Sequence, residues 1–415
     1  MGPVGCFGQK ENIKLQSLFY FALAAVLVAS ACEKSTLVPE FAKDAVSLST
    51  NGTANCYIVK PASSVSFPVA YKGNSTSDAI SGGSSVKVVW QDVKGLVKEL
   101  WYDSAAKVAY ASVSDASGNA VVALCSEAGE ILWSWHLWVC DYDPSKTLFT
   151  TAANESGTTW TFMDRNLGAL TANPEGFGSH GLIYQWGRKD PFPGAATYTK
   201  QNEDYSYIKD GEPDLYDGED NKLPAIYTTA VGGGTLAKSI QNPSVFYKLE
   251  KVNTGEKDEY GDDIIVNNPK TGDWTSTSND DYWGGVSGKK TIYDPCPVGY
   301  KVPVCDADGN TPYAWLVFKQ MTWDTVNYGA MQDGQWFPAT GTRVNFSGGF
   351  DFADPAEGGI PYSGLWIGTA GKTSSNLEEY PDLYGQYMFI INGKRTFKCN
   401  KDRRSQGLSL RCVAE

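Results

Sequence analysis

Residues 131–140 (ILWSWHLWVC) constrain the fold of this 415-residue chain more than any other stretch. Successive side chains of a β-strand point to opposite faces. A strand here would carry two alternating sets of side chains, one made of Trp133, Trp135, Leu137 and Val139 and the other of Ser134, His136, Trp138 and Cys140. Because both sets contain large apolar groups, we predict a central strand covered on both faces.

Short segments with a strand pattern precede residues 131–140. Residues 85–90 and 107–113 alternate apolar and polar side chains, and residues 120–125 are predicted to form a return strand. Residues 114–119 (SDASGN) and 126–130 (SEAGE) have the composition of turns. Strands at such short intervals with turns between them are typical of a β-sandwich. We therefore predict an antiparallel β-sandwich domain over residues 55–149.

The composition indicates a β-rich protein that does not bind nucleic acid. Aromatic residues make up 13% of the chain and glycine occurs 43 times, which favours strands joined by tight turns. The formal net charge of −12 disfavours nucleic acid, because Lys and Arg must neutralise its phosphates. Of the nine cysteines, seven lie beyond positions 6 and 32, so at least one of the seven stays outside any intrachain disulfide.

The N-terminus has the pattern of a secretion signal. The apolar run at 18–28 is shorter than the roughly 20 residues that span a bilayer, and small residues follow it up to Cys32. Residues 29–32 (ASAC) resemble the lipobox of bacterial lipoproteins, whose cysteine is diacylated, although most lipoboxes have Leu at the position of Ala29. The resemblance implies a signal peptide at 1–31, a lipid on Cys32 and a surface-exposed outer-membrane protein. Ordinary cleavage beside a free cysteine is the alternative.

Residues 32–54 are predicted to connect the lipid to the first domain. They are small and polar without a sustained period, which indicates a flexible tether of about 22 residues, able to reach at most about 75 Å. Removal of residues 1–31 takes away two Lys and one Glu, so the charge becomes −13. No polybasic patch is left to hold an anionic membrane, and the lipid would be the membrane contact.

The rest of the chain, residues 150–415, is predicted to form a second domain. Residues 181–194 begin as a possible short helix, and Thr311-Pro312 is a good helix start for a helix to about Met321. Between them, residues 195–290 show little periodicity, and residues 190–290 contain 18 acidic and 10 basic side chains. We interpret residues 195–290 as a long insertion of surface loops with small elements of their own.

Several motifs recur in a fixed order in this second domain. They are FMDRNLGA (162–169), GLIYQWGRKDPF (181–192), DPCPVGYKVP (294–303), FPATGTR (337–343), GLWIGTA (364–370) and GLSLRCV (407–413). Together they resemble the Fibrobacter-type major paralogous domain, which is common in surface proteins of the Bacteroides group. The resemblance implies an α+β C-type-lectin-like fold, although Tyr300 stands where the family usually has Trp. Residues 55–74 and 131–139 more loosely resemble fimbria-like and adhesin-like lipoproteins.

The lectin-like resemblance also implies disulfides. By that analogy Cys296 and Cys412 would lie close enough to pair, and Cys305 and Cys399 could form a second bridge. Four cysteines allow three connectivities, so the pairing stays open. For Cys125 we expect a buried free thiol in the sandwich core.

Candidate ligand-binding residues lie mainly in the insertion. Aromatic side chains beside carboxylates and amides suit carbohydrates, and they also suit protein interfaces. The candidates are Tyr205, Tyr207, Tyr216, Trp274, Tyr282 and Trp283. Asp306, Asp308 and Asn310 have the look of a calcium loop, but Val317 stands where an EF-hand would have its Glu. Plain polar turns give the same pattern, so this interpretation stays open beside calcium. We predict no cofactor other than this possible calcium ion.

Catalysis has little support in the sequence. There is no G-x-S-x-G or H-E-x-x-H motif, and His136 and His180 are the only histidines. Residues 164–166 and 188–190 combine charges with nearby Trp side chains, and we favour a structural role in buried ion pairs over a ligand site. We therefore predict a non-enzymatic surface lipoprotein for adhesion or capture of a ligand, such as a glycan or a surface protein. A subunit of a fimbria-like assembly with pilin-like partners is the alternative, and a polysaccharide hydrolase is the third hypothesis.

Substitution of Cys32 tests the anchor. We expect Cys32→Ser to abolish labelling by an alkyne-tagged fatty acid and to move the protein from the membrane to the soluble fraction. Cys6→Ser is the matched control and should be labelled like the parent protein. Labelling that persists in Cys32→Ser would contradict lipidation at this residue.

Overall fold

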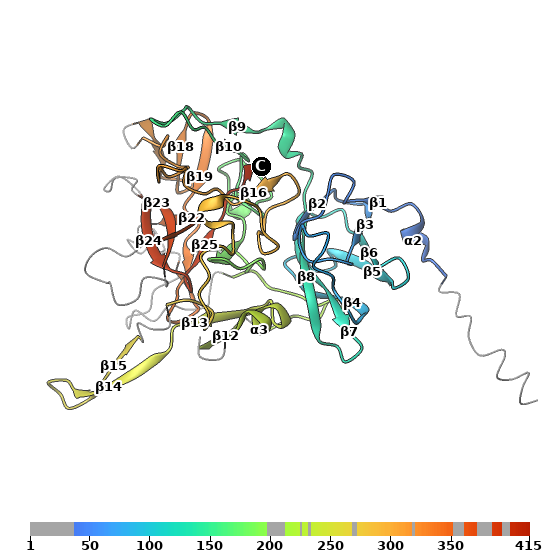
Figure 1. The fold of residues 1–415 in the computed structure, drawn as a ribbon, viewed down its shortest axis with the longest axis horizontal. Coiled ribbons are helices and arrows are strands. Elements are labelled where there is room, and N and C mark those ends of the chain that lie inside the picture. The colour runs from blue at the N-terminus through green and yellow to red at the C-terminus, as the bar shows by residue number, and fades with distance from the viewer. Residues whose placement is uncertain are drawn as a thin grey trace, which may run out of the picture.

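The computed structural model describes residues 37–196, 212–224, 226–230, 234–267, 272–317, 320–351, 361–371, 384–391 and 399–415. Within these ranges the protein is built from several β-sheets with few short helices, which confirms the predicted β-rich class. Figure 1 shows two bodies side by side, which we call the first unit (residues 40–140) and the second unit (residues 141–415). No helix in the described part of the chain is long and apolar enough to cross a membrane.

The first unit consists of two four-stranded sheets. One has the order β1-β3-β6-β5, with bounds Val46–Ser47, Ser64–Pro68, Val108–Val113 and Val97–Asp103. The other has the order β2-β8-β7-β4, with bounds Cys56–Val59, Ile131–Val139, Gly118–Ser126 and Gly83–Gln91. The other strand pairs of these sheets are antiparallel as predicted, but β1 joins β3 and β2 joins β8 in parallel.

An apolar core fills the space between these two sheets. Phe67 and Ala111 face it from one sheet, and Trp135 and Leu137 face it from the other. A β-bulge in β4 changes the alternation of that strand, so Val88 packs in this core while Trp90 packs on the opposite face of its sheet. Both faces of the β4 sheet are therefore covered by apolar contacts.

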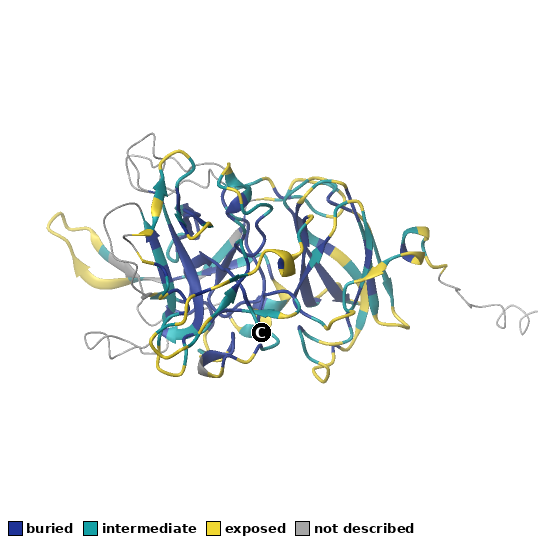
Figure 2. Cartoon of the chain, turned by 90° about the horizontal axis from the view of Figure 1, so that it is seen from above, coloured by how far each residue is buried: buried dark blue, intermediate teal, exposed yellow. Residues whose placement is uncertain are grey.

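Strand β8 is the central covered strand that the sequence predicts. It is paired with β2 on one side and β7 on the other, and Trp133 and Trp138 are both fully buried. Trp133 packs between the sheets of the first unit, whereas Trp138 and Cys140 belong to a core that includes Leu167 and Leu410 of the second unit. One apolar core thus runs from the first unit into the second (Figure 2).

The predicted tether is ordered where the structure describes it. Helix α2 (Glu40–Lys43) packs against β3 and β6, and Ala42 is buried. Strand β1 follows and adds to the edge of β3. The expectation of a flexible segment reaching residue 54 is therefore wrong, because residues 40–54 dock on the first unit.

The second unit contains one large sheet and several small ones. The large sheet has the order β21-β20-β25-β22-β23-β24, with β11 also paired to β25. These strands span Phe350–Asp351, Thr342–Arg343, Gly407–Ser409, Tyr362–Gly371, Tyr384–Ile391, Cys399–Arg403 and, for β11, Ile183–Gln185. A four-stranded sheet has the order β16-β26-β10-β9, formed by Tyr300–Lys301, Val413–Ala414, Thr161–Phe162 and Phe149–Thr150.

Smaller elements complete the second unit. A three-stranded sheet contains β17, β18 and β19, at Thr322–Asp324, Gly329–Gln332 and Gln335–Pro338. Strands β12 and β13 pair in parallel and β14 and β15 form a hairpin, with bounds Tyr227–Ala230, Val245–Lys248, Lys251–Lys257 and Asp263–Asn267. Helix α3 (Leu236–Gln241) and the 3₁₀ turns Pro144–Lys146, Phe177–Ser179 and Gly285–Ser287 are the remaining described helices.

Both predicted helices of the second unit are wrong in the described residues. Residues 312–315 form turns with i→i+3 hydrogen bonds, in which the N–H of Ala314 donates to the carbonyl of Thr311. Residues 183–185 are strand β11, which pairs with β25 and is fully buried. Pairing and burial of this short segment override its weak helical signal.

A disulfide joins Cys296 to Cys412, as the lectin-like resemblance implies, and its sulfur atoms are 2.03 Å apart. It links β26 at the C-terminus to the segment that leads into β16. Cys305 is a buried free thiol, so the predicted bridge to Cys399 is wrong. The Cys305 thiol lies 3.6 Å from the side-chain oxygen of Gln386, which gives this sulfur a polar partner instead. Cys125 is a buried free thiol as predicted.

Loss of this disulfide should destabilise the protein strongly. The bridge closes a loop of 116 residues, and cross-links of this length lower the free energy of the folded state relative to the unfolded chain by about 3–5 kcal/mol. We expect Cys412→Ser to lower the free energy of unfolding by that amount in a denaturant titration, and the parent protein to approach the same value under reducing conditions. Cys125→Ala, which removes a free thiol, should cost about 1 kcal/mol. Equal losses in both variants would contradict a stabilising bridge.

Candidate functional site

Buried polar contacts fix the two units against each other at the outer face of β8. The Ser134 hydroxyl donates to Asp190 at 2.6 Å, and the Lys189 ammonium donates to Asp190 at 2.6 Å and to the Ser134 carbonyl at 3.0 Å. Trp138 Nε1 donates to the carbonyl of Ala169 at 3.1 Å. Burial lowers the pKa of Lys189, and Asp190 opposes that shift. The structural interpretation of residues 188–190 is confirmed.

Two arginines support the same region from within the second unit. The guanidinium of Arg188 is buried and donates to the carbonyls of Val245 at 2.6 Å and Pro243 at 3.2 Å. Arg165 pairs with Asp164 at 2.9 Å and lies over the Tyr142 ring, 3.7 Å from its centroid. These contacts use the charged side chains to position backbone segments.

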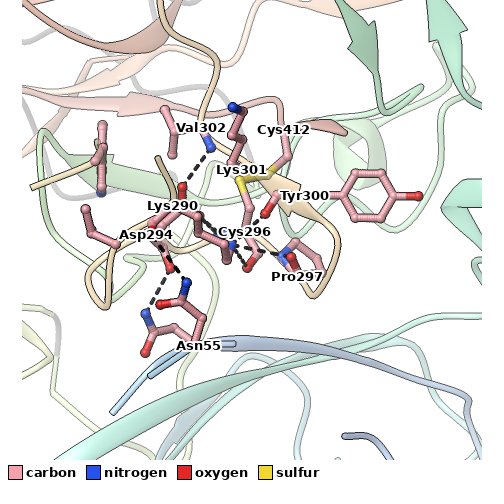
Figure 3. A network of polar contacts seen from close by, with 12 residues as sticks. Asn55, Lys290, Asp294, Cys296, Pro297, Tyr300, Lys301, Val302 and Cys412 are labelled. Atoms are coloured by element: carbon pink, nitrogen blue, oxygen red, sulfur yellow. Dashed lines mark hydrogen bonds and ion pairs between the residues drawn. A yellow bond between two sulfur atoms is a disulfide. The ribbon is translucent and has the colours of Figure 1, made fainter. Parts of the chain in front are cut away.

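A second buried network surrounds Lys290 (Figure 3). The Lys290 ammonium donates to Asp294 at 2.8 Å and to the carbonyls of Cys296 at 2.9 Å and Tyr300 at 2.5 Å. Asp294 also accepts from the backbone N–H of Cys296 at 2.8 Å and of Val302 at 2.9 Å. Lys290 and Asp294 are buried, and their charges are neutralised by each other and by several hydrogen bonds. The network lies beside the Cys296–Cys412 bridge and immobilises that part of the second unit.

The Lys290 network continues into the first unit through Asn55. The Asn55 amide donates to the carbonyls of Ile292 at 2.7 Å and Asp294 at 2.9 Å, and its oxygen accepts from Trp133 Nε1 at 2.9 Å. Gly73 makes another close contact. Its φ of +52° and the position of a built Cβ, only 2.5 Å from the Ile292 carbonyl oxygen, mean that only glycine fits there.

A polar groove of about 750 Å³ opens beside these contacts. One wall is the loop 74–78 of the first unit, and the other is formed by residues between 281 and 292 of the second unit. The solvent-facing groups are the hydroxyls of Thr76, Ser77 and Ser287, the carboxylates of Asp78 and Asp281 and the ammonium of Lys289. The groove therefore presents hydrogen-bond donors and acceptors from two walls held in a fixed relation.

Both walls of the groove are anchored by hydrogen bonds. The Ser75 hydroxyl donates to Asp78 at 2.6 Å and accepts from the Asp78 N–H at 2.8 Å, which closes the first loop on itself. Asn74 donates to the carbonyl of Lys290 at 3.3 Å across the two units. The Thr291 hydroxyl donates to the carbonyl of Tyr282. A ligand would meet a largely preformed surface.

The groove was not visible in the sequence. Its walls lie about 200 positions apart along the chain, and residues 74–78 (NSTSD) give only a turn signal by themselves. Contacts across the two units, such as those of Asn55 and Asn74 with residues 290–294, bring the two walls together.

The predicted aromatic ligand platform is wrong for three of its members. Trp274, Tyr282 and Trp283 are buried, with exposed fractions of 1%, 4% and 1%. Trp274 Nε1 donates to the carbonyl of Trp186, and Trp283 Nε1 donates to that of Arg188 at 3.2 Å. These rings belong to the core of the second unit because the segment that carries them folds inward.

The other aromatic candidates lie elsewhere. Tyr216 is half-buried, and its backbone pairs with Gln91 of β4 through two hydrogen bonds of 2.9 Å. Tyr205 and Tyr207 lie outside the described residues. In its described residues the insertion contains small elements such as α3 and the exposed β14–β15 hairpin, as predicted, while the segments that carry Trp274, Tyr282 and Trp283 are built into the core.

The candidate calcium loop is held by its own hydrogen bonds. The Asp306 carboxylate accepts from the N–H of Asp308 at 3.0 Å, the N–H of Asn310 at 2.8 Å and the side chain of Asn154 at 2.7 Å. Desolvation opposes ionisation of Asp306, but hydrogen bonds from Asn310 and Asn154 lower its pKa below the usual range. Calcium at Asp306, Asp308 and Asn310 stays a prediction. The described residues hold no group of three or more Asp, Glu, His or Cys side chains arranged for a metal ion.

The two histidines are buried, with exposed fractions of 2% for His136 and 4% for His180. Nε2 of His136 lies 3.0 Å from the side-chain oxygen of Asn119, whose amide donates to Asp92 at 3.0 Å. Desolvation lowers the pKa of His136 to about 3 and that of His180 to about 3. Both rings are therefore neutral at physiological pH. Desolvation likewise raises the pKa of Cys56, Cys125, Cys140 and Cys305.

No family model, no curated protein and no solved structure matches this chain.

The buried His136 should make stability depend on pH. Its pKa rises from about 3 in the folded protein to near 6.5 in the unfolded chain, so the unfolded chain binds more protons between these values. The stability that neutral His136 contributes is complete above about pH 6.5 and is lost as the pH falls towards 3. We subtract the free energy of unfolding of His136→Gln from that of the parent. We expect this difference to fall by about 1.4 kcal/mol for each pH unit by which the pH is lowered across this window.

Urea titrations at several pH values measure this difference. The contributions of the other titrating groups are the same in the two proteins and cancel in the difference. A difference in unfolding free energy that stays constant from pH 7 to pH 4 would show that folding does not lower the pKa of His136.

Proposed function

We propose that this protein is a lipid-anchored, non-enzymatic surface protein that captures a hydroxyl-rich ligand, such as an oligosaccharide, in the groove between its two units. The observation that carries the proposal is the groove itself, which is lined by hydroxyl, carboxylate, amide and ammonium groups from both units. Sugars offer many hydroxyls that donate and accept hydrogen bonds, and such groups on the protein complement them.

The rigidity of the walls favours binding. Ordering loops on association costs free energy, which lowers affinity. Here the loop 74–78 is closed by Ser75 and Asp78, and the opposite wall is held by Thr291 and by the Lys290 network. The loops are ordered when the protein folds, so binding loses little conformational entropy. A few hydrogen bonds to a sugar can then suffice for recognition.

Other features support binding without catalysis. A nucleophile or a general base needs access to substrate and a suitable pKa. His136 and His180 are buried with strongly lowered pKa values, and the free thiols of Cys56 and Cys125 are buried with raised ones. These side chains serve packing in the described part of the protein.

The lectin-like resemblance agrees with several contacts. The segment DPCPVGYKVP and the closing RCV are joined by the Cys296–Cys412 bridge and by pairing of β16 with β26. We therefore also propose a C-type-lectin-like relationship for the second unit. The turns at residues 312–315 depart from that pattern, which would place a helix there.

Substitution of groove residues tests ligand capture. The full chain is screened on a glycan array, and its hits are measured by calorimetry. We expect Asp281→Asn to weaken binding about tenfold, which corresponds to about 1.4 kcal/mol, because a charged acceptor is removed. Ser77→Trp should abolish binding, because the larger side chain would fill the groove. Asp115→Asn changes an exposed carboxylate outside the groove and should bind like the parent.

Two results would contradict the proposal. One is a folded parent protein that binds no glycan on the array. The other is a glycan that binds Ser77→Trp and Asp281→Asn as tightly as the parent. Protease treatment of intact cells separately tests surface exposure, since a protein that faces the periplasm would be protected.

A further inference from the structure

Strand β4 is an edge strand with an open backbone over part of its length. In its sheet it has β7 as its one neighbouring strand, and β5 is likewise the last strand of the other sheet. Both edge strands lie on the same side of the first unit (Figure 1). The N–H and C=O groups on the outer side of an edge strand are free to pair with an added strand.

Two grooves flank the same stretch of β4. The first has a volume of about 490 Å³ and a mainly polar lining, with Val89, Ile131 and Pro243 among its apolar members. The second has a volume of about 410 Å³ and lies towards β5, with Val86, Val88 and Leu100 in its walls. Lys87 and Val88 line both grooves, so the edge of β4 runs between them.

One residue from a distant part of the chain already pairs with this edge in an antiparallel β-bridge. The N–H and C=O of Gln91 exchange hydrogen bonds of 2.9 Å with Tyr216, which comes from a distant part of the chain. The chain then turns at residues 217–220 and leaves the edge, with Gly218 beside Val88. The part of β4 before Val88 continues along the same edge, and no described residue forms a backbone hydrogen bond with its outer side.

We propose that the edge of β4 over residues 83–88 binds an extended segment of another protein by strand addition. Main-chain hydrogen bonds would continue the ladder that Tyr216 begins, and alternate side chains would enter the two grooves. Each groove has both polar and apolar lining residues. Ile131 and Pro243 are apolar members of the first groove and Val86 and Leu100 of the second, so an apolar residue of the segment can pack in each groove. Lys87 lies between the grooves and forms no ion pair with another described residue. The grooves carry charges of both signs, because Glu130 lines the first and Lys98, Glu99, Asp217 and Glu219 line the second.

This site is distinct from the groove between the two units. It uses strands β4 and β5, the turn at 129–131 and the end of α3, none of which lines the ligand groove. Loss of glycan binding and loss of strand addition are therefore separable by substitution.

The test uses 12-residue peptides selected from a random library against the full chain. We expect the selected peptides to lack proline and to be rich in β-branched and aromatic residues. Their binding should slow hydrogen exchange of backbone amides in residues 83–88. Peptides that protect a different segment, or that bind as helices, would overturn the proposal.

Two variants fill the grooves from exposed positions. Gln241→Trp at the end of α3 fills the first groove, and Glu219→Trp fills the second. Each should weaken peptide binding at least about tenfold. Ala237→Trp and Lys94→Trp are matched controls, because both positions are exposed and line neither groove, and they should bind like the parent. Unchanged binding by both filling variants would overturn the proposal, and all four variants should retain glycan binding if the parent shows it.

Discussion

The structure depends on strand β8 being covered on both faces. One face packs in the core of the first unit through Trp135, and the other packs on the second unit through Trp138. Burying two such aromatic side chains on opposite faces contributes several kcal/mol, and exposing either one would lose that contribution. The two units are consequently folded around a shared layer and are not separate domains on a linker. This packing fixes the positions of the two units and therefore the shape of the groove between them.

Buried charges give that packing a single arrangement. Lys189 with Asp190 and Lys290 with Asp294 are both removed from water, and each ammonium also reaches backbone carbonyls. Such pairs add little net stability compared with apolar residues, but a displaced unit would leave a buried charge without its partner, at a cost of about 3–5 kcal/mol. The charges therefore select one orientation of the units. The apolar core supplies most of the cohesion.

Local pattern predicted the first unit better than the second. Alternation identified β4, β6 and β8, because each of these strands has at least one face against a core, and β7 followed as the return strand between two turns. In the described residues 312–315 turns replace the helix expected after Thr311, because a good cap offsets only part of the cost of nucleating a helix. The aromatic residues of the insertion could not be assigned to core or surface, since a Trp suits both. The groove depends on contacts between residues about 200 positions apart, which no local pattern contains.

The docking of residues 40–54 has a consequence for how the protein would sit at a membrane. Helix α2 and strand β1 are part of the folded body, so only six residues separate the proposed lipid on Cys32 from Pro39. That spacer reaches about 25 Å at most. A body held so closely explores a thin layer above the bilayer, and its encounters become nearly two-dimensional. Weak individual contacts then gain from high local concentration, and neighbouring copies can engage one multivalent ligand together.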